Sequence, residues 1–265
     1  MLLDFDRLGL MRPVLVAIGI LLCVFLLLPI VFIVLLSFGS SQWLIFPPPG
    51  WTMKWYVAFF SNGEWLQSAL TSLKIAVLVA VLSVVIGLCT ALALTRGSFP
   101  GKQAFSALVL MPMVLPVVVL AVSIYSFFLK IGLNGTLTGF VLAHLVIALP
   151  FSVIVITNGL RKFDKAIEDA AILCGASPLE AMLRVTLPAI GFSLFSAAIF
   201  SFLASWDEVV IAIFMASPTL QTFPVKIWTT LRQDLTPVIA AASSLLILLT
   251  GMMLLISGYF MRRAR

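Results

Sequence analysis

Charge is the scarcest property of this 265-residue sequence, because Asp, Glu, Lys and Arg together make up only 10% of it while apolar residues make up 62%. The mean hydropathy is correspondingly high, at +1.22. A soluble domain needs far more charge to cover its surface, so this composition excludes one. It is typical of a bundle of membrane-spanning helices, and we expect an all-α membrane protein.

Residues that carry catalysis or bind metals are equally rare. There is one histidine, His144, and the three cysteines are Cys23, Cys89 and Cys174. No H-E-x-x-H, G-x-S-x-G or G-x-x-x-x-G-K-[ST] motif occurs, so the sequence predicts no catalytic, metal or ATP site in this chain. We expect His144 to be packed or hydrogen-bonded, since no second titratable group falls on its helix face. The net charge of +6 is spread over short loops without an aromatic and basic patch, which argues against nucleic acid.

Six apolar segments have the roughly 20 residues that a helix needs to cross a bilayer. They cover residues 13–37, 67–95, 104–129, 139–160, 189–216 and 238–260. An even number of spans places both termini on one side of the membrane. We predict a single transmembrane domain over residues 1–265.

Prolines interrupt two of these spans. Pro112 and Pro116 lie in the third and Pro150 in the fourth. Each removes a backbone hydrogen bond, so we expect bent helices there. The bends either surround a cavity or serve packing alone. Before the second span, we expect a short helix over residues 54–60 lying along the outer membrane surface.

Basic residues are divided unequally between the two sides. The larger group is Arg7, Arg12, Arg96, Lys102, Arg161, Lys162, Lys165, Arg184, Arg262, Arg263 and Arg265; the smaller is Lys54, Lys130, Lys226 and Arg232. Cytoplasmic loops carry the excess of Lys and Arg, so the side with the larger group is predicted to be cytoplasmic. Both termini are then expected to lie in the cytoplasm.

The loop 161–188, between the fourth and fifth spans, has a composition unsuited to the membrane interior. Gly175 allows the chain to turn there. Ser177 can cap a second helix, with Pro178 at its first position and Glu180 three residues after the cap, which is the capping-box arrangement. We therefore predict a helix-turn-helix in water on the cytoplasmic side.

This loop contains a series of residues whose spacing can be compared with known motifs: Asp169-Ala170-Ala171, then Gly175, then V-x-L-P ending at Pro188. The spacing resembles the EAA loop of binding-protein-dependent ABC importer permeases, with Asp169 where that motif has glutamate. The next helix is expected to begin at Pro188. The resemblance implies a type I ABC importer permease (MetI-like) fold of six transmembrane helices in the bacterial inner (cytoplasmic) membrane. It also implies a cytoplasmic coupling helix between helices 4 and 5 that docks in a cleft of an ATPase. The coupling residues it implies are Asp169, Ala170, Ala171, Gly175, Ala176, Ser177, Pro178 and Leu179.

Two adjacent carboxylates, Asp207 and Glu208, lie in the fifth span. A charged group this deep costs about 2.5 kcal/mol or more and usually serves function. On a continuous helix Glu208 shares a polar stripe with Ser205, while Asp207 points elsewhere. We expect one or both to line a translocation path that favours a cation, with Trp206 available for a cation–π contact. The alternative is a structural pair satisfied by backbone groups or by a partner subunit.

Four runs, WYVAFF, SWDEVVIAIF, TFPVKIW and PVIAAASSLL, are similar to the second permease of spermidine/putrescine and opine-type importers. This similarity implies a non-enzymatic permease subunit of an ATP-driven importer, for polyamines or for another small solute such as an opine, an amino acid derivative or an organophosphonate. The implied partners are a second permease forming a heterodimer, two ATPase subunits that bind ATP and Mg, an external solute-binding protein and membrane lipid. This chain is expected to hold no cofactor.

Two other functional classes, a secondary transporter and an intramembrane enzyme, account for fewer of these sequence features. A secondary transporter also places carboxylates in the membrane, but it normally shows repeated halves with paired broken helices, and we find no such repeat. An intramembrane enzyme needs catalytic groups on facing spans, and with one histidine and so few polar residues that class is disfavoured.

Overall fold

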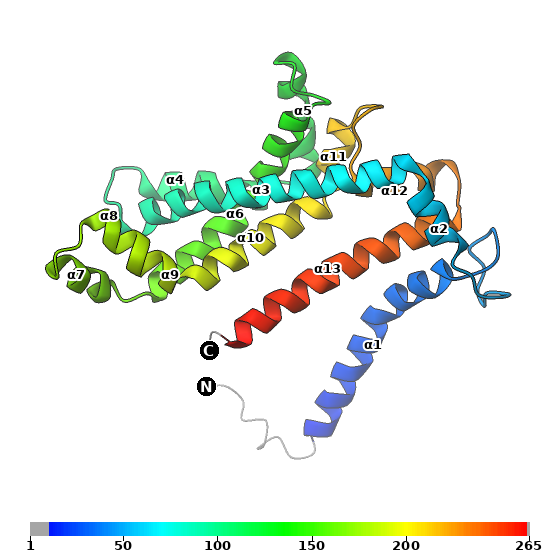
Figure 1. Ribbon diagram of the computed structural model, residues 1–265, viewed down its shortest axis with the longest axis horizontal. Coiled ribbons are helices and arrows are strands. Elements are labelled where there is room, and N and C mark those ends of the chain that lie inside the picture. Colours follow the sequence, from blue (N-terminus) through cyan, green and yellow to red (C-terminus); the bar gives the residue numbers. More distant parts are fainter. Residues whose placement is uncertain (1–10, 264–265) are drawn as a thin grey trace. The chain divides into compact units, whose positions relative to one another are not determined.

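The computed structural model describes residues 11–263, and these residues form helices and isolated backbone bridges with no strand (Figure 1). The predicted all-α class is confirmed for this part of the chain. Arg7 and Arg265, which entered the charge count, lie outside the described residues. In chain order the helices are α1 (Met11–Ser37), α2 (Lys54–Ser61), α3 (Gly63–Arg96), α4 (Lys102–Leu110), the 3-10 turn η2 (Met111–Met113), α5 (Val117–Lys130), α6 (Leu137–Lys162), α7 (Lys165–Leu173), α8 (Pro178–Ala181), the π-helical turn η3 (Met182–Thr186), α9 (Leu187–Ala189), α10 (Gly191–Trp206), α11 (Val210–Met215), α12 (Phe223–Gln233) and α13 (Pro237–Arg263).

The described residues fall into two compact units. Unit 1 holds residues 11–62 and 230–249, and unit 2 holds residues 63–229 and 250–263. That all of them form a single domain stays a prediction.

Four helices, α1, α3, α6 and α13, are each long and apolar enough to cross a membrane. They match the first, second, fourth and sixth predicted spans. The number rises to as many as six if two bent helix pairs each count as one span. The third predicted span is therefore a broken helix. The second bent pair, Pro178–Ala189 with Gly191–Trp206, begins before the fifth predicted span (189–216), which the structure divides between α10 and α11.

The break in the third span lies where the prolines predict it. The helix pair Lys102–Met113 and Val117–Lys130 is bent by 101°. Pro116 is the N-cap of α5, with φ −57° and ψ 124°. A proline disfavours helical geometry in the residue before it and cannot donate a backbone hydrogen bond, so the first helix of the pair ends before Pro116. At Pro150, by contrast, α6 continues from Leu137 to Lys162 without interruption.

Unit 1 joins α1 to α2 through a loop rich in aromatic residues. The hydroxyl groups of Ser37 and Tyr56 are hydrogen-bonded at 2.7 Å, and the Trp55 indole donates to the Gly39 carbonyl at 2.7 Å. The short helix expected over residues 54–60 is confirmed as α2. Almost all of α1 is exposed, and none of its most apolar stretch is buried, so its side chains are left for lipid or for another chain.

Unit 2 is built around α3, α6 and α10, which pack closely through small residues. A Cβ added at Gly87 of α3 would lie 2.4 Å from the Ser152 hydroxyl of α6, and one at Gly159 of α6 would lie 2.3 Å from the Ser193 hydroxyl of α10. Ser152 also donates to the Ser83 carbonyl of α3 at 2.7 Å. These contacts fix α6 between its two neighbours.

The helices α7 and α8 lie at one end of unit 2, and α12 begins at the opposite end (Figure 1). The three-helix core thus connects the predicted cytoplasmic loop with the segment that follows the fifth span.

Candidate functional site

The loop between α6 and α10 folds as the sequence predicts. The Asp164 carboxylate caps α7 by accepting from the Ala166 amide at 2.9 Å, and Gly175 turns the chain with φ at +98°, a conformation that favours glycine. Before α8, the Ser177 hydroxyl accepts from the Glu180 amide and the Glu180 carboxylate accepts from the Ser177 amide at 3.0 Å. The predicted helix-turn-helix and its capping box are both confirmed.

The end of this loop differs from the prediction that a new helix begins at Pro188. The helix that starts at Pro178 runs through the π-helical turn η3 and past Pro188 to Ala189, and the 68° bend follows it, before α10 begins at Gly191. The π turn already interrupts the regular i to i−4 hydrogen bonds, so Pro188 requires no further break. Helix α10 consequently starts at Gly191.

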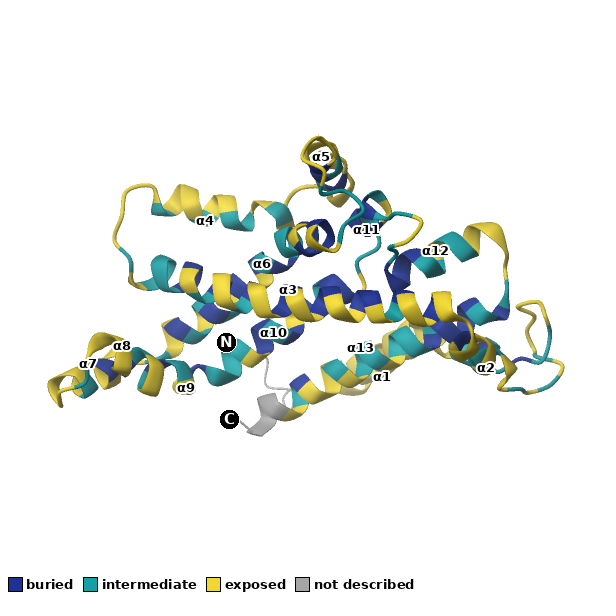
Figure 2. Ribbon diagram, turned by 45° about the horizontal axis from the view of Figure 1, so that its top comes forward, coloured by how far each residue is buried: buried dark blue, intermediate teal, exposed yellow. Residues whose placement is uncertain are grey.

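Most of the predicted coupling residues are on the surface (Figure 2). Asp169, Ala170, Gly175, Ser177, Pro178 and Leu179 are exposed, and Ala171 and Ala176 are partly exposed. Apolar side chains stand out among them, with Leu179 60% and Leu173 89% exposed. These two leucines come just before and just after the turn at Gly175. Sequence reasoning missed Leu173, although an apolar residue beside a turn was a readable signal.

Glu168, one residue before the predicted motif, is the buried acid of the loop. Its residue exposure is 6%, and both of its carboxylate oxygens accept from the Arg96 guanidinium at 2.7 Å. The Thr186 hydroxyl donates to one of the same oxygens. We call Arg96, Glu168 and Thr186 the Glu168 clasp, because they tie α7 to the end of α3 and to η3. Asp169 points outward and forms a surface ion pair with Lys165 at 3.9 Å.

The clasp holds an ionised carboxylate. Burial alone would raise the pKa of Glu168, but hydrogen bonds from Thr186 and Arg96 and the charges of Arg96 and Lys165 outweigh it and lower that pKa. A lowered folded-state pKa means that the clasp stabilises the fold at any pH above the ordinary value for glutamate and is lost only on acidification below it. The clasp is therefore intact at neutral pH.

The carboxylates of the fifth span lie at a helix break. Helix α10 ends at Trp206 and α11 begins at Val210, so the stripe that a continuous helix predicts does not form. Glu208 accepts from the Ile211 amide at 2.7 Å and so caps α11, whereas Asp207 is exposed. The structure thus separates the pair into a helix cap and an accessible carboxylate.

The two residues before the break are buried. The Ser205 hydroxyl is hydrogen-bonded to Nδ1 of His144 at 2.9 Å, which confirms the prediction of a hydrogen-bonded histidine. Trp206 is 4% exposed and stacks on Phe202, with ring centroids 5.8 Å apart. In this conformation Ser205 and Trp206 anchor the end of α10 rather than face an open path.

Comparison with known proteins gives one family match that covers more than half of the chain. Residues 83–265 match the model of binding-protein-dependent transport system inner membrane components. The chain is 30% identical over 239 residues to a spermidine/putrescine transport system permease protein, PotC, of Haemophilus influenzae, covering 90% of this chain and 93% of that protein. It is 31% identical over 248 residues to a putrescine transport system permease protein, PotI, of Escherichia coli, covering 91% and 88%.

Solved structures share the fold at low sequence identity. One is a bacterial ABC transporter involved in the import of the polysaccharide alginate, with a TM-score of 0.73, 16% identity and coverage of 98% of this chain and 97% of that one. Another is the MetNI methionine ABC transporter in an inward-facing conformation, with a TM-score of 0.62, 19% identity and coverage of 76% and 95%.

Proposed function

The chain belongs to the family of binding-protein-dependent transport system inner membrane components, and from that membership we propose that it passes polyamines across the inner membrane as half of a permease heterodimer. As a member of this family it is a permease subunit of an ABC importer, a transport subunit and not an enzyme. The observation that carries the proposal is the loop 164–181, an exposed and fully capped helix-turn-helix fastened to a membrane helix by the Glu168 clasp.

The polyamine solute is supported by the relatives and by one side chain. Relatives named for spermidine or putrescine transport share 30–31% identity with almost the whole chain. Asp207 adds an exposed carboxylate at a break within a span, where a negative charge is retained at a cost of about 2.5 kcal/mol or more. A polyamine offers the complementary ammonium groups.

Energy for transport comes from partners in this proposal. The sequence has no phosphate-binding G-x-x-x-x-G-K-[ST] loop, so ATP and Mg are assigned to two ATPase subunits. The coupling residues around Gly175, together with Leu173, contact the ATPase from the cytoplasmic side. A second permease completes the path, and an external solute-binding protein delivers the solute.

Uptake in cells tests the function. Labelled putrescine and a labelled zwitterionic amino acid are offered to cells with and without this subunit, in the presence of its partners. We expect putrescine uptake to require the subunit, and amino acid uptake to be the same with and without it. Putrescine uptake that is equal in both strains would overturn the proposed solute.

Substitution of Gly175 tests the docking loop. Gly175 (φ +98°) and Gly101 (φ +79°) both have open space where a Cβ would lie, so alanine at either adds a similar backbone strain of about 1–2 kcal/mol. We expect Gly175→Ala to lower ATPase activity of the purified complex several-fold, because it distorts the turn between α7 and α8. Gly101→Ala, outside the loop, is the matched control and should leave the ATPase activity near that of the wild type. Equal losses of ATPase activity in the two variants would mean that backbone strain, and not the docking loop, causes the loss.

Cysteine labelling tests the orientation. The native cysteines Cys23, Cys89 and Cys174 are exposed, so each is first replaced by alanine. We expect a cysteine at Thr219, an exposed position after the fifth span, to react with a membrane-impermeant maleimide in intact cells. A variant that retains only Cys174 serves as the opposite control and should react only after the cells are opened. The reverse pattern would contradict a cytoplasmic loop.

A further inference from the structure

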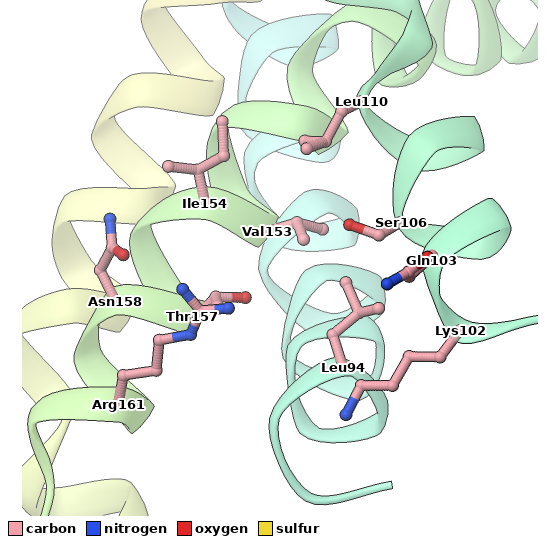
Figure 3. A pocket seen from close by; sticks show the side chains of 10 residues that line it. All are labelled: Leu94, Lys102, Gln103, Ser106, Leu110, Val153, Ile154, Thr157, Asn158 and Arg161. Atoms are coloured by element: carbon pink, nitrogen blue, oxygen red, sulfur yellow. The ribbon is translucent and has the colours of Figure 1, made fainter. Parts of the chain in front are cut away.

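A cavity of about 630 Å³ lies between the end of α3, the whole of α4 and the second half of α6, where the loop 161–188 begins, and none of its lining residues belongs to the break between α10 and α11 (Figure 3). We propose that this cavity binds the phosphate headgroup and upper acyl chain of an anionic phospholipid from the cytoplasmic leaflet. The proposal rests on the orientation given above and is independent of which solute the permease carries.

The charge of the cavity points to an anion. Lys102 and Arg161 line it from α4 and α6, and none of the described residues that line it is acidic. Within residues 11–263, Arg161 makes no hydrogen bond or ion pair, so its guanidinium is free to bind a ligand. Lys102 uses one of its three ammonium donors on the Gly97 carbonyl at 2.9 Å. Basic pockets between helices on the cytoplasmic side are typical sites for anionic headgroups.

The rest of the lining suits an amphiphile rather than a free ion. Gln103 enters the cavity from the side opposite Arg161 (Figure 3), and apolar side chains, among them Leu110 and Ile154, lie further along it. Ile154 precedes Arg161 by about two helical turns, so the cavity runs roughly 10 Å along α6 from its charged end. That distance takes it from headgroup level into the hydrocarbon region.

Counting bound lipids on the complete importer complex tests the site. The delipidated complex is titrated with phosphatidylglycerol and, separately, with phosphatidylcholine, and bound lipids are counted by native mass spectrometry. We expect Arg161→Gln to weaken phosphatidylglycerol binding about fivefold. Lys162→Gln is the matched control, because this adjacent cation at the end of α6 does not line the cavity. Equal binding by the two variants would overturn the proposal.

Two further measurements distinguish the cavity from surface charge and from a free-anion site. Ile154→Trp fills the apolar part of the cavity without changing charge, and we expect it to weaken binding as Arg161→Gln does. Unchanged binding by Ile154→Trp would mean that only surface charge attracts the lipid, which overturns the cavity site. Displacement of the lipid by millimolar inorganic phosphate would identify a free-anion site instead. None of these measurements requires transport, so their outcome does not depend on whether the polyamine proposal is correct.

Discussion

Replacing Arg96 with alanine is expected to remove most of the ATP-driven uptake, by an order of magnitude or more, while ATP binding by the partner subunits is unaffected. The physical reason is the Glu168 clasp. Without Arg96, the buried Glu168 carboxylate keeps the Thr186 hydroxyl as its hydrogen-bond donor but loses the bidentate cation. Removing one partner of a buried ion pair costs roughly 3–5 kcal/mol, and the 27% exposure of the Arg96 side chain places this case toward the lower end.

The measurement is ATPase stimulation by the solute-loaded binding protein, followed in parallel with thermal stability of the purified complex. Lys162→Ala, which removes a cation at the nearby end of α6, is the control and should change neither. The double variant Arg96→Leu/Glu168→Leu should recover stability, since no unpaired charge remains buried, yet it should stay uncoupled because α7 is no longer tied to α3. Full stimulation in Arg96→Ala would refute a coupling role for the clasp.

Asp207→Asn is expected to lower putrescine uptake at least tenfold without loss of assembly. Asparagine keeps the size of the side chain and removes the charge that a diammonium solute meets at the break between α10 and α11. Because the Asp207 side chain is exposed and it is Glu208 that caps α11, neutralising Asp207 leaves the fold intact.

Glu208→Gln is the matched control for Asp207→Asn. The glutamine oxygen can still accept from the Ile211 amide, so the cap of α11 persists and uptake should remain within a few-fold of wild type. Uptake is measured over a range of putrescine concentrations with complex abundance held equal. If the two neutralised variants lose uptake equally, the separation into cap and solute contact is wrong.

The local features of the fold were readable from the sequence because neighbouring residues determine them. The Ser177 hydroxyl accepts from the Glu180 amide and the Glu180 carboxylate accepts from the Ser177 amide whatever surrounds them, and Gly175 adopts the left-handed turn that other residues disfavour. The long apolar runs likewise predicted α1, α3, α6 and α13.

What the sequence could not show depends on contacts between distant residues. Arg96 and Glu168 are 72 positions apart, so no motif links them, and the buried acid proved to be Glu168 rather than the motif residue Asp169. The break after Trp206 was also hidden, because FLASWDEVVIAIF contains neither glycine nor proline to signal it. Helical spacing therefore predicted a stripe joining Glu208 to Ser205 that the break after Trp206 prevents.

A continuous series of contacts connects the Glu168 clasp with the helix break at Asp207 through unit 2. The loop of α7 and α8 is fixed to α3, and α3 packs with α6 and α10 through the small residues at Gly87 and Gly159. In the proposed mechanism, we expect a movement imposed on the loop to be passed to α10, which ends beside Asp207.

Transport by the complete complex in proteoliposomes tests this mechanism most directly. Labelled putrescine and its solute-binding protein are supplied on one side and ATP with Mg on the side of the loop. We expect putrescine accumulation that requires both ATP and the binding protein. Accumulation driven by an imposed ion gradient in the absence of ATP would contradict the mechanism and would identify a secondary transporter.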